Sequence, residues 1–438
     1  MDPLDNYYGR LLTSKQVPDH LKGSAKTFKA LIKTGTILKC FRCQSQIRQE
    51  NQLATGEYYC RKCLVFGRLT SNDYLFHFES KVFPKLNSLL WQGQLTSFQE
   101  KISEKLIENY KKKKTTLVHA VTGAGKTEMI YQLVATVLDQ GGWVCIASPR
   151  IDVCVELEKR MAKDFSCPIQ LMYGQAEAYQ RRPLIIATIH QLMKFYQAFD
   201  LLVVDEVDSF PYVDNAFLNQ ARKNALKKDG RLVLLTATST EKLEKKVTEG
   251  SIEKISLARR FHNQPLVVPD FKLILSLSEQ INQGRLPKTL YHLISKQRQS
   301  SYPLLIFFPT IEQGKQFYEL IIKNFPKESV AFVSSQAIKR NESIEQFRNK
   351  EKTILITTTI LERGVTFPCI DVFVILSNHR LYNSSSLVQI SGRVGRSSDR
   401  PSGQLLFIHD GISRAMIKAR KEIQEMNKEA YHCELSNL

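Results

Sequence analysis

The chain has 438 residues, of which 43% are hydrophobic, and its formal net charge is +19. This length suits about three domains of ~150 residues each, and the positive charge favours a polyanionic partner such as a nucleic acid. The sequence has no run of about 18 apolar residues and does not start like a signal peptide, which excludes the membrane-spanning and secreted classes. We therefore expect a cytoplasmic protein whose nine cysteines are reduced.

The first part of the chain contains four regularly spaced cysteines. Residues 1–36 form a basic segment without a clear period, and residues 37–94 are expected to form a module with its connector. Within this module, two CxxC pairs are separated by 16 residues, and their members are Cys40, Cys43, Cys60 and Cys63. Four thiolates at this spacing predict a structural Zn²⁺ site with a closed tetrahedral shell. Such a small module needs the metal in order to fold.

Cations and aromatic residues alternate around these cysteines. They are Arg42, Arg48, Arg61, Lys62 and Arg68, with Phe41, Tyr58, Tyr59 and Phe66. Aromatic faces stack on bases while cations follow phosphates, so nucleic-acid contact is one interpretation. The other is that the aromatics form a small core in a module that docks on protein, and the sequence leaves both open.

A phosphate-binding loop follows at the start of the next domain, 95–262. An apolar run, 116–121, leads into Ala120-Val121-Thr122-Gly123-Ala124-Gly125-Lys126-Thr127, and a helical stretch, 128–138, comes after it. Strand, glycine loop, Lys-Thr and helix together predict ATP binding, with backbone N–H groups at the phosphates. Lys126 would reach the β- and γ-phosphates, and Thr127 would hold Mg²⁺. Upstream, Gln99 is positioned to bond the adenine edge.

Apolar runs then alternate with helical ones, which predicts a parallel sheet covered on both faces. The expected strands are 143–147, 184–188, 201–205 and 232–236, and helices are expected at 153–163 and 216–227. The strand 201–205 ends at Asp205-Glu206-Val207-Asp208. Asp205 is expected to hold Mg²⁺, and Glu206 to orient and deprotonate the attacking water.

Polar residues also follow the other strands of this domain. Pro149, Arg150, Thr188 and His190 are candidate contacts to the backbone of a nucleic acid. Thr236 and Thr238 are candidates for coupling the nucleotide state to the rest of the motor. Asp208 joins them, because it is more suited to pairing with residues across the cleft than to touching ATP.

A linker, 263–285, leads to a second domain, 286–438, with the same alternation but no second phosphate loop. Strands are expected at 304–308, 330–333, 354–357, 372–376 and 405–408, and a C-terminal helix at 412–429. Thr358, Thr359 and Gly364 are candidate nucleic-acid contacts. Gln389, Arg393 and Arg396 are candidate catalytic residues. On a helix the two arginines would share a face and act as arginine fingers on the γ-phosphate.

This ordered set, from Gln99 to Arg396, resembles a superfamily 2 helicase or translocase motor. The resemblance implies two tandem RecA-like domains of the α/β class and ATP-driven movement along nucleic acid. With the four-cysteine module in front, the whole chain resembles the ComFA family of late-competence ATPases, which is similar in turn to the primosomal helicase PriA. That family implies single-stranded DNA and ComFC as partners, at the uptake channel on the inner face of the cell membrane, and leaves homo-oligomerisation open.

Two residues depart from the usual motor pattern. Ala120 replaces the first glycine of the loop, and Thr366 stands where many related motors have aspartate, which puts a ribose contact there in doubt. Three functions remain to be distinguished. They are an ATP-dependent single-stranded DNA translocase in transformation, a duplex-unwinding helicase in replication restart or repair, and a zinc-anchored adaptor with a vestigial ATPase.

Overall fold

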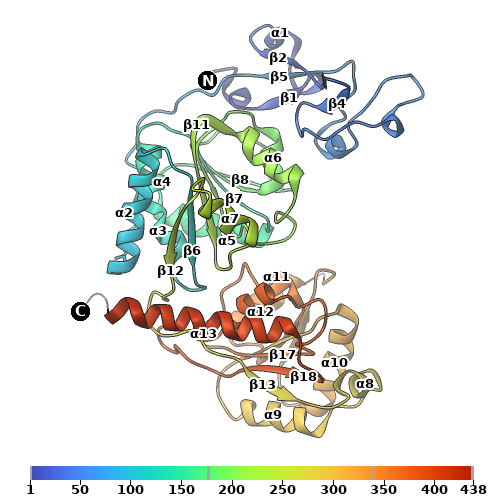
Figure 1. The fold of residues 1–438 in the computed structure, drawn as a ribbon. Coiled ribbons are helices and arrows are strands. Elements are labelled where there is room, and N and C mark those ends of the chain that lie inside the picture. The colour runs from blue at the N-terminus through green and yellow to red at the C-terminus, as the bar shows by residue number, and fades with distance from the viewer. Residues whose placement is uncertain (1, 175–177, 338, 436–438) are drawn as a thin grey trace. The chain divides into compact units, whose positions relative to one another are not determined.

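The computed structural model describes residues 2–174, 178–337 and 339–435. These residues form two compact units, which we describe one at a time (Figure 1). The first unit comprises Met1–His119 and Lys126–Ser256, and the second comprises Ala120–Gly125 and Leu257–Leu438. No helix in the described ranges combines the length and the apolar character needed to cross a membrane.

The first unit is built on a seven-stranded sheet of its described residues, in the order β12-β6-β11-β10-β7-β9-β8. The strands are β6 (Thr116–Ala120), β7 (Val144–Ser148), β8 (Ile169–Met172), β9 (Leu184–Thr188), β10 (Phe199–Val204), β11 (Leu226–Thr236) and β12 (Glu253–Leu257). All pairs from β6 to β8 are parallel. Their side chains are buried on both faces, which explains the uninterrupted apolar runs in the sequence.

Helices connect and cover these strands. They are α2 (Ser97–Lys111), α3 (Lys126–Met129), α4 (Tyr131–Asp139), α5 (Ile151–Asp164), α6 (Ala216–Ala225) and α7 (Glu241–Thr248). α4 packs on β7 and β10, α5 on β7, β8 and β9, and α6 on β11. Since parallel strands end at the same edge of a sheet, the polar residues after β7, β9 and β10 are brought to one edge.

The N-terminal module belongs to the first unit and contains two small antiparallel sheets. Its elements are β1 (Leu11–Thr13), α1 (Asp19–Lys22), β2 (Lys26–Lys29), β3 (Leu31–Thr34), β4 (Ile37–Cys40) and β5 (Tyr74–His77). β5 is the central strand of the order β1-β5-β2, so residues expected in a connector hold the basic N-terminal segment in place. These strands could not be predicted from the sequence, because strands of three or four residues are too short to show a hydrophobic period.

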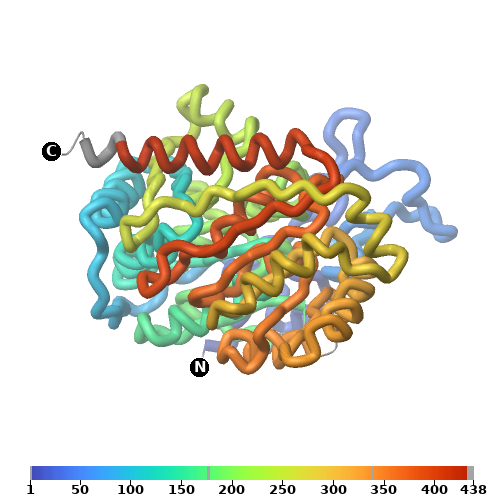
Figure 2. Tube along the Cα trace, turned by 90° about the horizontal axis from the view of Figure 1, so that it is seen from below, coloured from blue at the N-terminus to red at the C-terminus, as the bar shows by residue number. Residues whose placement is uncertain are grey.

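The second unit is built on a six-stranded sheet of its described residues, and every pair in it is parallel. In sheet order the strands are β13 (Asp270–Leu273), β18 (Leu405–His409), β17 (Asp371–Ile375), β14 (Leu304–Phe307), β16 (Ile354–Thr357) and β15 (Val330–Val333). The helices are α8 (Leu277–Asn282), α9 (Lys288–Arg298), α10 (Ile311–Asn324), α11 (Arg340–Arg348), α12 (Ser384–Ser391) and α13 (Arg414–Leu435). Figure 2 shows α13 as one continuous helix, and it packs on α12.

The two parallel sheets confirm the predicted fold class, and the expected strands lie within two residues of those observed, except that β11 begins at Leu226. Residues 263–285 were expected to form a linker, but they contain β13 and α8. β13 pairs with β18 at the edge of the second sheet, and most of its side chains are exposed. An exposed edge strand lacks the apolar run by which the other strands were recognised.

Candidate nucleotide site, nucleic-acid contacts and metal centre

The phosphate loop has the backbone conformation that its glycines permit. β6 ends at Ala120, and α3 begins at Lys126. Between them, Gly123 has φ +81° and Gly125 has φ +76°, a left-handed region in which side chains are strained. Ala120 lies in the strand and has no positive φ, so its replacement of the usual first glycine strains nothing. The two glycines thus give the loop the turn that the phosphate-loop pattern predicts.

Gln99 is held by its own helix. Thr96 caps α2, and both its N–H and its Oγ1 donate to Oε1 of Gln99, at 2.8 and 3.1 Å. The side chain is 4% exposed. Its oxygen therefore serves in a capping box, a local signal that the sequence analysis overlooked. Adenine recognition by Gln99 stays a prediction.

The two candidate catalytic carboxylates follow β10 directly. Asp205 Oδ1 accepts the N–H of Glu206, at 2.8 Å, and Glu206 has φ +55°. Arg150 Nε lies 3.9 Å from Glu206 Oε2, and it donates to Ser209 Oγ at 3.3 Å. The structure thus places Arg150, expected as a nucleic-acid contact, beside the proposed general base.

The third carboxylate of this segment makes a different set of contacts. Asp208 accepts from the hydroxyls of Thr236 and Thr238, at 2.8 and 2.5 Å. Both threonines belong to the end of β11 and the residues after it, and pairing of Asp208 across the cleft stays a prediction. The three residues form one hydrogen-bonded group, and their coupling role stays a prediction.

The candidate nucleic-acid contacts of the first unit lie at adjacent strand ends. Ser148 pairs with Thr188 in the register of β7 and β9, so Pro149 and Arg150 follow next to Thr188. Thr188 is buried, and His190 lies in the 3₁₀ helix Ile189–Lys194. Burial lowers the pKa of His190, so the imidazole is neutral near pH 7. It offers hydrogen bonds to a phosphate backbone and no charge.

The candidates of the second unit follow β16. Thr358 is buried, Thr359 begins the 3₁₀ helix Thr359–Leu361, and Gly364 has φ +79°. Sequence analysis did not single out Glu362 and Arg363, although both are buried and their charged atoms lie 3.7 Å apart. No periodic signal marks a buried ion pair within a loop. Residues 358–364 therefore form a loop at the end of this strand that contains a buried ion pair.

The two candidate arginines do not share a helix face, so that expectation is wrong. α12 ends at Ser391, with Gly392 as its cap, and Gly395 has φ +66°. Arg393 is 3% exposed and its Nε donates to the Glu362 carbonyl at 3.3 Å, whereas Arg396 Nη1 donates to the exposed Thr366 Oγ1 at 3.1 Å. Glycines at both ends of the turn give the arginines different surroundings. Gln389 remains on α12 and is 8% exposed.

The second unit, which includes loop residues 120–125, places Arg396 beside the loop. Phe261 N–H donates to the Gly123 carbonyl at 3.0 Å. A Cβ on Gly123 would lie 3.7 Å from Cγ of Arg260 and from Cγ of Arg396. Burial and the nearby Arg396 lower the pKa of Arg260 to about 10. The side-chain stems of two arginines thus lie beside Gly123, while the Arg260 guanidinium donates to the carbonyls of Val394 and Gly395.

The four module cysteines converge as the spacing predicts. Their ligand atoms all lie within 4.8 Å of one another, and all four are buried. Sγ atoms of Cys40 and Cys63 are 3.8 Å apart, and those of Cys43 and Cys60 are 3.5 Å apart. A Zn–S bond of about 2.3 Å places tetrahedral sulfurs about 3.8 Å apart, whereas a disulfide needs about 2.05 Å. The donor set therefore fits Zn²⁺.

The aromatics of the module form a core, which favours the docking interpretation for them. Phe41 stacks on Phe28 with ring centroids 4.5 Å apart, and both rings contact Tyr196. Arg42 is 2% exposed, donates to the Phe66 carbonyl, and its own carbonyl accepts from Asn224 on α6. The cations that stay exposed are Arg48, Arg61, Lys62 and Arg68.

Comparison with known proteins adds family information to this geometry. Residues 96–246 match the DEAD/DEAH box helicase family, and residues 285–398 match the helicase conserved C-terminal domain. The chain is 54% identical to Competence protein ComFA of Streptococcus pneumoniae, covering 97% of this chain and 98% of that one. It is 34% identical to Competence protein ComFA of Bacillus subtilis, covering 91% and 88%.

Solved structures share the fold at low sequence identity. S. cerevisiae Dbp5 bound to RNA and ADP BeF3 superposes with a TM-score of 0.53 at 18% identity, covering 76% of this chain and 91% of that chain. RecG bound to a three-way DNA junction gives a TM-score of 0.53 at 15% identity, covering 78% and 47%. These likenesses show the fold alone.

Proposed function

The chain belongs to the ComFA family of competence proteins, and from this membership and its site we propose that it is an ATP-driven translocase that moves single-stranded DNA inward during natural transformation. The helicase domains imply ATPase activity. One observation carries the proposal: in a chain of the ComFA family, a phosphate loop with its glycines in the left-handed region precedes an intact carboxylate pair. A vestigial ATPase would not need to keep them.

The chemical roles follow from the residue types. Lys126 would contact the β- and γ-phosphates, and Thr127 and Asp205 would hold Mg²⁺, which neutralises phosphate charge when bound. Glu206 accepts the proton of the attacking water, and Arg150 lies beside that carboxylate. Arg396 stabilises the charge that develops on the γ-phosphate. Gln389 and Arg393 support this segment.

The DNA strand is proposed to contact Pro149, Arg150, Thr188 and His190 in the first unit, and Thr358, Thr359 and Gly364 in the second. The group Asp208, Thr236 and Thr238 links the catalytic segment to the end of β11 and would transmit the nucleotide state. Lobe closure on ATP and reopening after hydrolysis would move the strand. ComFC and the uptake channel at the inner membrane face are the proposed partners.

Replacing Glu206 with glutamine is expected to lower kcat by about 10²–10⁴-fold, because the amide keeps the shape but cannot accept the proton. ATP affinity should change little. The measurement is steady-state ATP hydrolysis with a separate nucleotide-binding assay. Asp214→Asn makes the same chemical change on the same segment, where the carboxylate pairs with the exposed Lys242, and should retain activity. If Glu206→Gln and the unmodified protein hydrolysed ATP at the same rate, Glu206 would not be the general base.

Single-stranded DNA is expected to stimulate ATP hydrolysis several-fold at low salt, and increasing salt should weaken that stimulation. ATPase titrations with single-stranded DNA, duplex DNA and RNA measure this, with Glu206→Gln as the inactive control. Absence of stimulation by any single strand would contradict the proposal. Strand separation on a forked duplex, if observed, would instead favour a helicase in replication restart or repair.

A further inference from the structure

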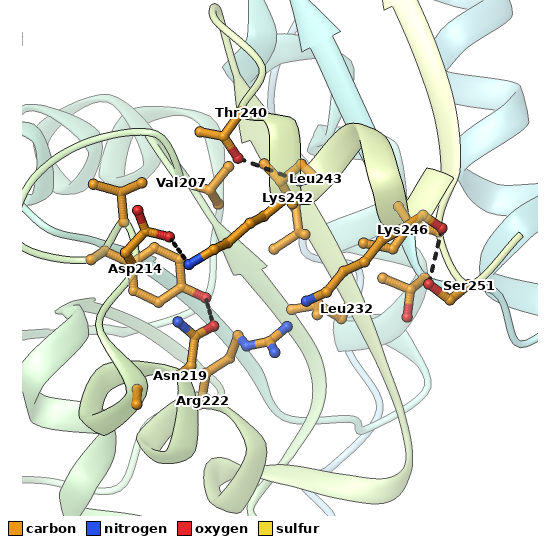
Figure 3. A pocket seen from close by; sticks show the side chains of 16 residues that line it. Val207, Asp214, Asn219, Arg222, Leu232, Thr240, Lys242, Leu243, Lys246 and Ser251 are labelled. Atoms are coloured by element: carbon orange, nitrogen blue, oxygen red, sulfur yellow. Dashed lines mark hydrogen bonds and ion pairs between the residues drawn. The ribbon is translucent and has the colours of Figure 1, made fainter. Parts of the chain in front are cut away.

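A hollow of about 450 Å³ lies in the first unit, walled by α6, α7, β11 and the segment that follows the catalytic carboxylates (Figure 3). Its apolar lining includes Val207, Tyr212, Leu232, Leu234, Leu243 and Ile252. None of the residues predicted to bind ATP or DNA lines it. The hollow is therefore a separate feature of this unit.

Cations dominate the rim of the hollow. Lys242 pairs with Asp214 at 2.5 Å, and these two side chains are exposed. Arg222 and Lys246 also line it, and Figure 3 shows their charged ends directed into the space beside Leu232. In the described part of the chain neither has an ion-pair partner, and Arg222 Nε is buried there without a hydrogen bond. An unsatisfied buried donor is unfavourable, and binding of an anionic acceptor would remove that cost.

A second hollow of about 380 Å³ continues from the first. The two share Thr115, Arg222 and Leu232. The second is also lined by Lys223, Lys227 and Lys228, of which Lys227 pairs with Asp200 at 2.7 Å. Arg222 thus lies where two cation-rich hollows meet, and the positive surface extends along α6.

We propose that this double hollow binds an acidic segment of a partner protein, with an apolar side chain of that segment over Leu232 and its carboxylates facing Arg222 and Lys246. Apolar anchors with flanking charges are a common mode of peptide recognition. The apolar lining beside these cations favours a peptide, because a phosphate backbone has no apolar side chain to place over Leu232. Tyr212 is 5% exposed, and its hydroxyl donates to Asn219 Oδ1 at 3.3 Å.

Occupancy of the hollow would act on the catalytic segment. Val207 and Tyr212 line the hollow; Val207 follows Glu206 directly in the chain, and Tyr212 lies in the same segment after it. Val207 N–H also donates to the Leu235 carbonyl at 3.2 Å, which ties the segment to β11. A bound peptide would therefore alter the ATPase rate. This consequence rests on the proposed function, whereas peptide binding itself does not.

Fluorescence anisotropy with a dye-labelled peptide, a run of aspartates followed by phenylalanine and leucine, tests the proposal at low salt. Lys246→Glu and Arg222→Glu should each weaken binding by about 10- to 100-fold, as expected for loss of a charge-assisted contact. Lys245→Glu is the matched control, because it makes the same charge change one residue earlier on α7 but does not line the hollow. It should leave affinity unchanged.

Two results would overturn the proposal. One is equal peptide affinity in the unmodified protein and in Lys246→Glu, a substitution of an exposed side chain that the fold should tolerate. The other is displacement of the peptide by an oligo-dT strand, if Lys246→Glu weakens binding of that strand and Lys245→Glu does not. That result would assign the hollow to nucleic acid. A peptide with serines for phenylalanine and leucine should bind more weakly, because it lacks the apolar anchor. None of these measurements requires ATP hydrolysis.

Discussion

Arg396→Ala is expected to lower kcat for ATP hydrolysis by about 10³–10⁵-fold while leaving the fold intact, as loss of an arginine finger does in other NTPases. Arg396 is less buried than Arg393. Its guanidinium donates to the hydroxyl of the exposed Thr366, and it can exchange this hydrogen bond for one to a phosphate. Its Cγ lies close to Gly123 of the phosphate loop, and its charge already lowers the pKa of Arg260. A phosphate anion would relieve this repulsion between cations.

Arg393→Ala is expected to act differently, because that side chain is buried and donates to the Glu362 carbonyl. Its loss should destabilise the second unit by about 1–3 kcal/mol through an unsatisfied buried acceptor. Thermal melting and steady-state kinetics of both variants separate the two roles. Arg380→Ala, at an exposed arginine, is the control and should change neither quantity. A stable Arg393→Ala protein without activity, next to an active Arg396→Ala protein, would reverse the assignment.

The sequence predicted those parts of the site in which local chemistry decides the structure. Gly123 and Gly125 adopt the left-handed backbone for which only glycine is suited, and Asp205 follows a strand whose apolar run is unmistakable. The cysteine spacing was sufficient because a tetrahedral metal site dictates which four thiols meet. In each case a short stretch of sequence is sufficient to predict the local structure.

Features that depend on distant partners could not be predicted in this way. Arg150 was assigned to nucleic acid from its place after a strand, but its contacts with Glu206 and Ser209 depend on the return of the chain through β10. β5 is central in its sheet only because β1 and β2, which come much earlier in the chain, flank it. Arg393 and Arg396 were placed on a helix because the residues before them are helical, and the cap at Gly392 ended it.

The zinc site is expected to support the first unit as a whole. Zinc analysis of the purified protein should give one ion per chain, and Cys60→Ser with Cys63→Ser should abolish binding. Structural zinc contributes about 10–16 kcal/mol of apparent binding free energy in zinc-finger peptides. Here Cys40, Cys60 and Leu31 belong to one continuous buried cluster with Trp143 and Phe195 of the motor sheet. Loss of the ion should therefore expose that shared core.

Hydrogen exchange in the double-cysteine variant measures how far the effect spreads. We expect faster exchange in β4, in β7 and in residues 189–194, because their side chains pack in the shared cluster. β14 and β17 have a separate core in the second unit and should stay protected. Cys154→Ser is the matched control, since it removes a buried thiol outside the zinc set and should retain the metal. If β7 stayed equally protected after zinc loss, the module would be independent of the motor sheet. The shared buried cluster would then not couple the stability of the two parts.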